Sequence, residues 1–193
     1  KEIKKSGLNY LFTKNIYKIV SSELAKGNII GWFQGSMEAG PRALGNRSII
    51  ADPRNENVRD LINLKIKKRE DFRPFAPSIM SEFTQDYFDI NDNVDSPFMT
   101  MVVDAKQKAL KDVPGVVHID GTSRVQTVSK EFNNKFYSLI QNFYKMTNVP
   151  ILLNTSLNVN GPISRDPDDA FEVFSKTNLD ALALQNWLLV KKW

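Results

Sequence analysis

The chain has 193 residues, of which 41% are hydrophobic and 25% charged, and its formal net charge is +4, a composition typical of a folded domain rather than a disordered segment. It contains no Cys and one His, which excludes disulfides, thiol catalysis and any metal site that needs two His ligands. No stretch approaches the roughly 18 apolar residues of a membrane-spanning helix, so the sequence excludes an integral membrane protein, and we expect a cytoplasmic one.

The chain start is Lys-rich and begins with Lys1 rather than Met, so we expect residues 1–14 to connect a missing N-terminal domain to one domain at residues 15–193. Hydrophobic periodicity predicts helices at residues 15–26, 56–67, 132–147 and 166–177. Short apolar runs predict strands at residues 28–33, 48–51, 98–103, 125–128, 149–153, 181–184 and 188–190, and Pro74 and Pro77 predict an extended path between them. This mixture indicates an α/β or α+β domain built on a twisted mixed sheet.

The positive charge is concentrated in one stretch. Residues 42–73 hold nine basic and five acidic residues, which leaves the whole excess of +4 there, and six of the chain's eight Arg lie in it. Since the planar guanidinium group suits carboxylates and phosphates, an anion-binding site is the first hypothesis. A salt-bridged helical face is the alternative that charge alone leaves open.

A glycine-rich loop, GPRALGNRS at residues 40–48, follows the predicted strand at 28–33. It has the G-x-x-x-x-G spacing of a phosphate loop, but Asn46 and Arg47 replace the Lys and Ser/Thr that such a loop requires. We therefore expect no true phosphate loop, although backbone N–H groups with Arg42 or Arg47 would still suit an anion. A tight turn that merely needs glycine is the alternative.

Two further motifs contain candidate ligands. If residues 67–69 are extended, Lys67 and Arg69 point to the same face, and Arg73 follows before Pro74. In the run NTSLN, strand alternation places Asn154, Ser156 and Asn158 on one face. A solvated basic turn and a simple Asn/Ser turn are the respective alternatives.

The segment HIDGTSR contributes the remaining candidates. Arg124 precedes a predicted strand and is the better ligand candidate, whereas a lone histidine such as His118 is more often structural than catalytic.

These motifs carry a family resemblance. The segments GSMEAGPRALGNRSIIADPR, KKREDFRPFAPS, HIDGTSRVQTV and NTSLNVNGPI, in this order, resemble the C-terminal domain of the O-carbamoyltransferases, a family that includes nodulation, cephamycin and aminoglycoside carbamoyltransferases. The resemblance extends from about residue 28 to 190. It implies a YrdC-like fold, an open twisted sheet with flanking helices, preceded in full-length members by a metal-binding domain of the actin/Hsp70 type.

The resemblance also implies an activity. The YrdC-like domain would bind ATP, with Mg²⁺, and carbamoyl phosphate, and form carbamoyl-adenylate, which the N-terminal domain would transfer to a hydroxyl acceptor. This piece would thus hold no metal site of its own, and a divalent transition metal would belong to the missing domain. The binding residues carried over from the motifs are Arg42, Lys67, Arg69, Arg73, Arg124, Asn154, Ser156 and Asn158, with Arg42, Lys67 and Arg73 in catalytic roles.

The chain departs from the family pattern at Leu157, where Phe is common, at Gly161-Pro162-Ile163, which lacks an acidic residue, and at Ser36 and Ala39, which replace bulkier residues. These departures concern substrate detail and metal handling. A nucleic-acid (RNA)-binding module of the same fold is the alternative function, disfavoured because few aromatic residues accompany the basic run. A domain that has lost activity and only binds partners is a third reading. The acceptor, the pathway and the oligomeric state lie outside what the sequence identifies.

Overall fold

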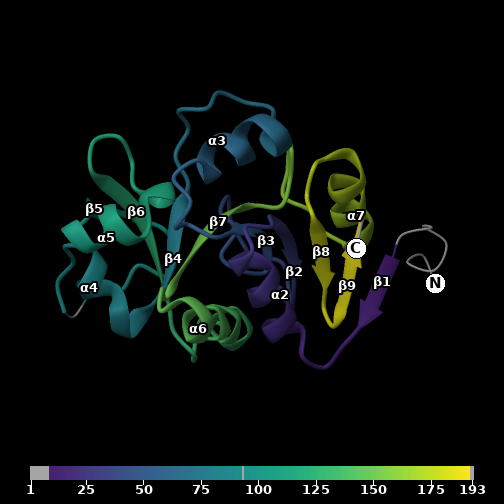
Figure 1. The fold of residues 1–193 in the computed structure, drawn as a ribbon, viewed down its shortest axis with the longest axis horizontal. Coiled ribbons are helices and arrows are strands. Elements are labelled where there is room, and N and C mark those ends of the chain that lie inside the picture. Colours follow the sequence, from purple (N-terminus) through teal and green to yellow (C-terminus); the bar gives the residue numbers. More distant parts are fainter. Residues whose placement is uncertain (1–8, 93, 192–193) are drawn as a thin grey trace.

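The computed structural model describes residues 9–92 and 94–191. Its described strands form one mixed sheet in the order β1-β9-β8-β2-β3-β7-β4-β6-β5 (Figure 1). Pairs β2/β8 and β4/β6 are parallel, and the other neighbours are antiparallel. The strands are β1 (Asn9–Phe12), β2 (Ile30–Phe33), β3 (Arg47–Ala51), β4 (Ala76–Met80), β5 (Met101–Asp104), β6 (Thr122–Val128), β7 (Ile151–Ser156), β8 (Ala181–Leu184) and β9 (Trp187–Val190).

The helices are α2 (Ile16–Ala25), α3 (Val58–Ile62), α4 (Thr84–Tyr87), α5 (Gln107–Asp112), α6 (Asn134–Thr147) and α7 (Pro167–Lys176). Short 3₁₀ turns occupy Ser81–Phe83 and Pro114–Val116. Helices α2 and α6 pack side by side, and Ser21 Oγ donates a hydrogen bond to the Leu139 carbonyl across their contact (Figure 1). No helix in the described part of the chain is long and apolar enough to cross a bilayer.

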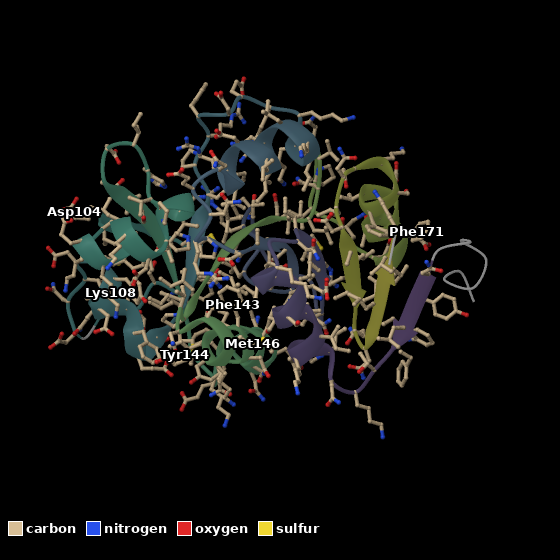
Figure 2. All side chains as sticks on the ribbon, in the orientation of Figure 1. Asp104, Lys108, Phe143, Tyr144, Met146 and Phe171 are labelled. Carbon is tan, nitrogen blue, oxygen red and sulfur yellow. The ribbon has the colours of Figure 1, made fainter. Side chains whose placement is uncertain are left out.

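The amphipathic helices form where periodicity predicts them. In α6, one stripe is buried while the opposite face is open to solvent, and Figure 2 shows Phe143, Tyr144 and Met146 along this helix. The Asn133 side chain caps α6 by accepting from the Phe136 N–H, and Asp166 caps α7 by accepting from two N–H groups. The helices predicted at 15–26, 132–147 and 166–177 are confirmed to within two residues at each end.

The helix predicted at 56–67 is shorter than expected. Helix α3 ends at Ile62, and a π-helical turn, Asn63–Lys67, replaces the rest. Lys68 then takes a left-handed conformation with φ 49°, so residues 67–69 do not meet the condition of an extended segment. The left-handed residue turns the chain sharply, so Lys67 and Arg69 are not placed by strand alternation.

Strand β4 lies in the segment that the two prolines mark as extended. It is a central strand between β7 and β6, a position that proline usually disfavours because it has no N–H to donate. The pairing with β6 begins only at Ser78, so Pro77 lies beyond the end of that ladder.

The other strand boundaries shift modestly. The strand predicted at 98–103 begins at Met101 instead, since Met99 has φ 56°, and the one predicted at 125–128 begins at Thr122. Residues 9–12 of the expected connecting segment form β1 at the sheet edge, and residues 1–8 lie outside the described residues.

Candidate functional site

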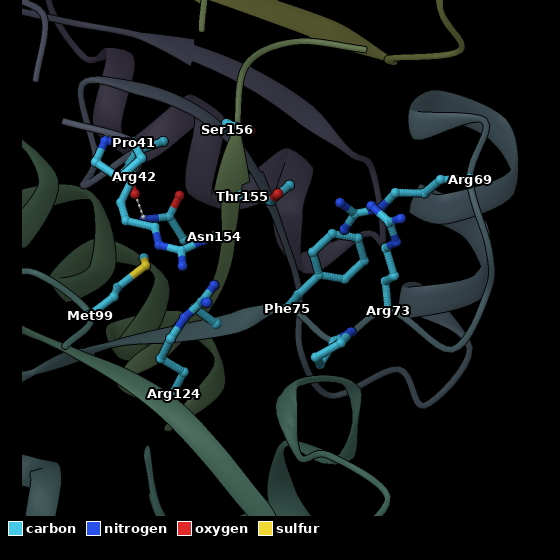
Figure 3. A pocket seen from close by; sticks show the side chains of 13 residues that line it. Pro41, Arg42, Arg69, Arg73, Phe75, Met99, Arg124, Asn154, Thr155 and Ser156 are labelled. Atoms are coloured by element: carbon cyan, nitrogen blue, oxygen red, sulfur yellow. Dashed lines mark hydrogen bonds between the residues drawn. The ribbon is translucent and has the colours of Figure 1, made fainter. Parts of the chain in front are cut away.

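A cavity of about 250 Å³ opens where β7 ends and β4 begins. Four arginines from three segments line it, as Figure 3 shows: Arg42 before β3, Arg69 and Arg73 before β4, and Arg124 in β6. Its walls are Pro41, Arg42, Ala43, Arg69, Arg73, Pro74, Phe75, Ala76, Met99, Arg124, Asn154, Thr155 and Ser156. As far as the structure describes the chain, no carboxylate and no histidine line this cavity.

Arg42 and Arg124 form one cationic side of the cavity. Burial lowers the pKa of the Arg124 guanidinium, and the positive charge of Arg42 lowers it further. The Arg124 Nε is buried without a hydrogen-bond partner among the described residues. Two adjacent cations with no nearby carboxylate favour an anion between them.

Arg69 and Arg73 form the other cationic side, and both have partners within the protein. Arg69 Nε donates to Asn63 Oδ1 at 2.7 Å, and its guanidinium lies over the Phe75 ring, 5.0 Å from the centroid. Burial and then the charge of Arg73 lower the pKa of Arg69, which Glu70 partly offsets. Arg73 Nε lies 2.9 Å from Glu70 Oε2 in an exposed ion pair.

Lys67 is buried behind the cavity wall, with 2% of its surface exposed. Its Nζ donates to the Ser156 carbonyl at 2.5 Å, to the Asn158 carbonyl at 2.9 Å and to Asn158 Oδ1 at 2.7 Å, and lies 3.3 Å from Ser156 Oγ. Burial and then the charge of Arg69 lower the pKa of Lys67 to about 7. Lys67 and Asn158 do not line the cavity. Both contact Ser156, which does line it, and hold it in place.

Asn154 lies in the cavity wall but is fixed from behind by a buried polar network. Its Nδ2 donates to the Ala43 carbonyl at 3.1 Å, the bond drawn in Figure 3, and lies 3.0 Å from both Ser78 Oγ and Gln126 Oε1. Gln126 Nε2 in turn donates to the Leu44 carbonyl at 3.0 Å. The network thus ties the loop that carries Arg42 to strands β4, β6 and β7.

The carboxylate of Glu38 holds the same loop in place by hydrogen bonds. Its Oε1 accepts from the backbone N–H groups of Leu44 and Asn46, both at 2.8 Å, and of Arg47 at 3.2 Å. Gly45 N–H donates to Ser48 Oγ instead. The N–H groups of residues 44–47 are consequently not free to cradle a phosphate, so only the part of the loop around Arg42, which lines the cavity, can present an anion-binding group.

Arg47 also does not face an anion. It is 4% exposed, its guanidinium donates to the carbonyls of Gln34, Gly35 and Asn46, and it stacks 3.5 Å from the Phe33 ring centroid. Sequence reasoning grouped Arg47 with Arg42 and missed Glu38 and Gln126. The sequence does contain a signal for Glu38, because it is a single acidic residue in a stretch rich in Gly and Arg.

His118 lies outside the cavity lining. Its Nδ1 is 3.1 Å from Thr122 Oγ1. Burial lowers the pKa of His118, Asp120 raises it in part, and Arg124 and Arg59 lower it further. This environment agrees with the structural role expected of a lone histidine.

The sequence of this chain is similar to those of known proteins. Residues 21–191 match the family model described as carbamoyltransferase C-terminus. The chain is 46% identical to the nodulation protein NolNO of Sinorhizobium fredii over 88% of the chain and 25% of that protein. It is 39% identical to a 3'-hydroxymethylcephem-O-carbamoyltransferase of Amycolatopsis lactamdurans, over 74% of the chain and 26% of that enzyme.

The fold also matches a solved structure, full-length HypF in its phosphate- and nucleotide-bound form, with a TM-score of 0.60 and 17% sequence identity. The match covers 92% of this chain and 22% of the HypF chain. The expected YrdC-like open sheet with flanking helices is thereby confirmed. The chain spans about a quarter of the length of the curated relatives named above.

Proposed function

Since the chain belongs to the carbamoyltransferase C-terminus family, we propose that it binds ATP and carbamoyl phosphate in the arginine-lined cavity and forms carbamoyl-adenylate. Transfer of the carbamoyl group to a hydroxyl acceptor would then take place on another part of the full-length protein. The names of the relatives support carbamoyl transfer, and the HypF structure contains phosphate and a nucleotide.

The observation that carries this proposal is the charge of the cavity. Four arginines enter about 250 Å³, and no carboxylate of the described residues lines it. A phosphate or triphosphate would neutralise these charges and accept several charge-assisted hydrogen bonds. The guanidinium groups would also stabilise the negative charge that develops on phosphate oxygens during transfer.

The proposed reaction takes place in two steps. Water forms a bond to the phosphorus of carbamoyl phosphate, the bond from this phosphorus to the bridging oxygen breaks, and hydrogen phosphate, carbamate and a proton result. A carbamate oxygen forms a bond to the α-phosphorus of ATP, the bond from this phosphorus to the bridging oxygen breaks, and pyrophosphate leaves with the electron pair. No histidine or carboxylate lines the described cavity to activate Ser156, whose Oγ donates to Asn158 Oδ1 at 2.7 Å. Ser156 would therefore orient a ligand rather than attack one.

Magnesium would enter with the nucleotide. Mg²⁺ is usually bound through carboxylates together with substrate phosphates, and the described lining of this cavity offers no carboxylate. The phosphates of ATP would thus supply its ligands, and Mg²⁺ would offset part of their charge. The arginines would bind the phosphate oxygens that remain free.

The test is exchange of radiolabelled pyrophosphate into ATP by the purified chain with carbamoyl phosphate and Mg²⁺. Exchange that depends on carbamoyl phosphate and falls in Arg124→Met is the expected result. If ATP does not bind and exchange is absent while the chain is folded, the proposed function is wrong.

The alternative is a nucleic-acid-binding module. Single-stranded RNA would bind through its phosphate backbone, and its affinity would fall steeply as salt rises. Nucleotide binding that persists between about 50 and 200 mM salt, with RNA binding that does not, would favour the enzyme.

A further inference from the structure

One hydrogen-bond acceptor in the wall of the arginine-lined cavity has no partner. Asn154 is 2% exposed, and its Oδ1 is buried and accepts no hydrogen bond from the described part of the chain. The side chain also lines the cavity. Because buried polar atoms of folded proteins are nearly always hydrogen-bonded, an unpaired acceptor in a cavity wall points to a ligand that supplies the donor.

The bonds of the amide nitrogen determine which end of the Asn154 side chain is left unpaired. Nδ2 donates to the Ala43 carbonyl at 3.1 Å and lies 3.0 Å from Gln126 Oε1. Gln126 is oriented in turn, since its Nε2 donates to the Leu44 carbonyl at 3.0 Å. Turning the Asn154 amide by half a rotation would place its oxygen against the Ala43 carbonyl, and two acceptors cannot pair. The unpaired atom is therefore an oxygen, and it requires a donor.

The cationic groups of the cavity do not satisfy this oxygen. Figure 3 shows Asn154 on the same side of β7 as Arg42 and Arg124. Within the described residues, neither arginine donates to Asn154 Oδ1, and the Arg124 Nε is itself a buried donor without an acceptor. The lining thus contains both an unsatisfied donor and an unsatisfied acceptor. Ionised phosphate oxygens accept hydrogen bonds, so a phosphate suits Arg124 and leaves Asn154 unpaired.

In the proposed reaction, the donor closest to a phosphate is the NH₂ of the carbamoyl group. A carbon and an oxygen separate it from the phosphorus of carbamoyl phosphate, whereas the hydroxyl and amino donors of ATP belong to the nucleoside. The cavity of about 250 Å³ is smaller than the roughly 300–1,000 Å³ of pockets that enclose a whole drug-sized ligand. A phosphate held by the arginines therefore brings the carbamoyl group, rather than the nucleoside, to Asn154.

We infer that Asn154 is a specificity-determining residue, whose Oδ1 accepts a hydrogen bond from the NH₂ of the carbamoyl group. The inference rests on the proposed function and adds how the site distinguishes carbamoyl phosphate from acetyl phosphate. Both molecules present the same phosphate and carbonyl oxygens to the arginines. The methyl group of acetyl phosphate cannot donate, so this ligand leaves Oδ1 buried and unpaired, at a cost in affinity.

The experiment compares two stable analogues by calorimetric titration. Carbamoylmethylphosphonate and acetonylphosphonate mimic carbamoyl phosphate and acetyl phosphate, and they differ only in NH₂ against CH₃. We expect the wild type to bind the carbamoyl analogue about ten- to hundredfold more tightly, as for a buried acceptor that gains its donor. Asn154→Leu has a similar volume and no acceptor, so the two affinities should become nearly equal.

Gln126→Leu is the matched control, because it disturbs the same polar network and leaves Asn154 Oδ1 in place. It removes one partner of Asn154 Nδ2 and the bond to the Leu44 carbonyl. We expect it to weaken both analogues by the same factor and to keep the preference for the carbamoyl analogue. If Asn154 acted only by holding the loop, the two variants would behave alike. Unfolding midpoints show whether each variant is folded, and the preference of the wild type decides if Asn154→Leu is not.

The outcomes separate this role from the function on which it rests. Equal binding of the two analogues by the wild type, or a preference that survives in folded Asn154→Leu, would overturn the role of Asn154. The proposed function would stand in either case, since the analogues still bind. Failure of the folded wild-type chain to bind both phosphonates and the nucleotide analogue β,γ-methylene-ATP would instead overturn the proposed function, and the role of Asn154 with it.

Discussion

The ammonium group of Lys67 lies 2.7 Å from Asn158 Oδ1, although 91 positions separate the two residues. The same group donates to the carbonyls of Ser156 and Asn158, so protein oxygens surround it. Lys67 therefore fixes the turn that follows β7, and through it the position of Ser156 in the cavity wall. Its Nζ also lies close behind the cavity wall, 3.3 Å from Ser156 Oγ.

The pH dependence of nucleotide binding follows from this position. In the free protein, burial and Arg69 lower the pKa of Lys67 to about 7, so Lys67 is largely neutral at pH 8. A bound triphosphate favours the charged form and raises this pKa. Binding at pH 8 should therefore take up a proton, and affinity should fall as the pH rises from 7 to 9.

Calorimetry of β,γ-methylene-ATP binding in two buffers of different ionisation enthalpy measures this uptake. Lys67→Met is the comparison, because it cannot take up a proton at this position. Equal proton uptake by the wild type and the variant at pH 8 would contradict the assignment to Lys67.

Glu38 should control the position of Arg42 without touching a ligand. Glu38→Ala removes the acceptor of three loop N–H groups, so we expect a loss of about 1.5–3 kcal/mol in the free energy of unfolding and weaker phosphate binding. Glu38→Gln keeps an oxygen acceptor without the charge and should lose less. Glu56→Ala, at an exposed position, should change stability by no more than about 0.5 kcal/mol. Chemical denaturation and phosphate titration measure both effects, and unchanged phosphate affinity in a destabilised Glu38→Ala would contradict this role.

Gly45 is required by packing as well as by backbone conformation. Its φ is 102°, and a Cβ at this position would lie 2.2 Å from the Phe136 ring on α6. Gly40 has φ 128°, but a Cβ added there would meet no atom within 4 Å, so Gly40→Ala is a matched control for the backbone alone. We expect Gly40→Ala to cost about 1–2 kcal/mol for the positive φ. Gly45→Ala should cost about 1–3 kcal/mol more, because α6 must move. Equal unfolding midpoints for the two variants would show that the loop relaxes away from Phe136.

Much of the fold follows from local patterns. Amphipathic stripes and caps such as Asn133 and Asp166 place the long helices, because each depends on residues within a few positions. The sequence does not predict β4 as a central strand, because Pro77 has no N–H to donate to a neighbouring strand. Pro77 is tolerated because the pairing with β6 begins only at the next residue, and the position of β6 is set by residues far away in the sequence. The left-handed Lys68 has no sequence signal of the kind that glycine gives.

The sequence predicted the charged residues of the site better than the residues that hold them in place. Arg42, Arg69, Arg73 and Arg124 line one cavity, as the charge excess and the motifs suggested, and Ser156 lies beside them. Arg47 has the same chemistry but is buried against backbone carbonyls, which composition cannot distinguish from ligand binding. Gln126 supports the loop from a strand more than 80 positions away, and its role depends on a contact that only the fold creates.

Acceptor carbamoylation needs groups that this cavity does not supply. Transfer of a carbamoyl group to a hydroxyl requires a group that assists deprotonation of the hydroxyl and a site that shields the adenylate from water. The described lining of the cavity consists of arginines, apolar residues and uncharged polar groups, and arginine is not a base near neutral pH. The matched segment is about a quarter of the length of the relatives named above, which leaves room for an acceptor site elsewhere in them.

We therefore expect residues 1–193 to exchange pyrophosphate but not to carbamoylate acceptors. The assay supplies the chain with ATP, carbamoyl phosphate, Mg²⁺ and a panel of hydroxylated acceptors, and detects products by mass spectrometry. The full-length cephem carbamoyltransferase of Amycolatopsis lactamdurans, with its hydroxymethylcephem acceptor, is the positive control because it shows that the assay detects transfer. Pyrophosphate exchange by the chain in the same reactions would show that its cavity is active, so that absent transfer is not a failure of folding. Acceptor carbamoylation at a rate comparable to the control would place the acceptor site within this chain, and the proposed division between adenylate formation and transfer would be wrong.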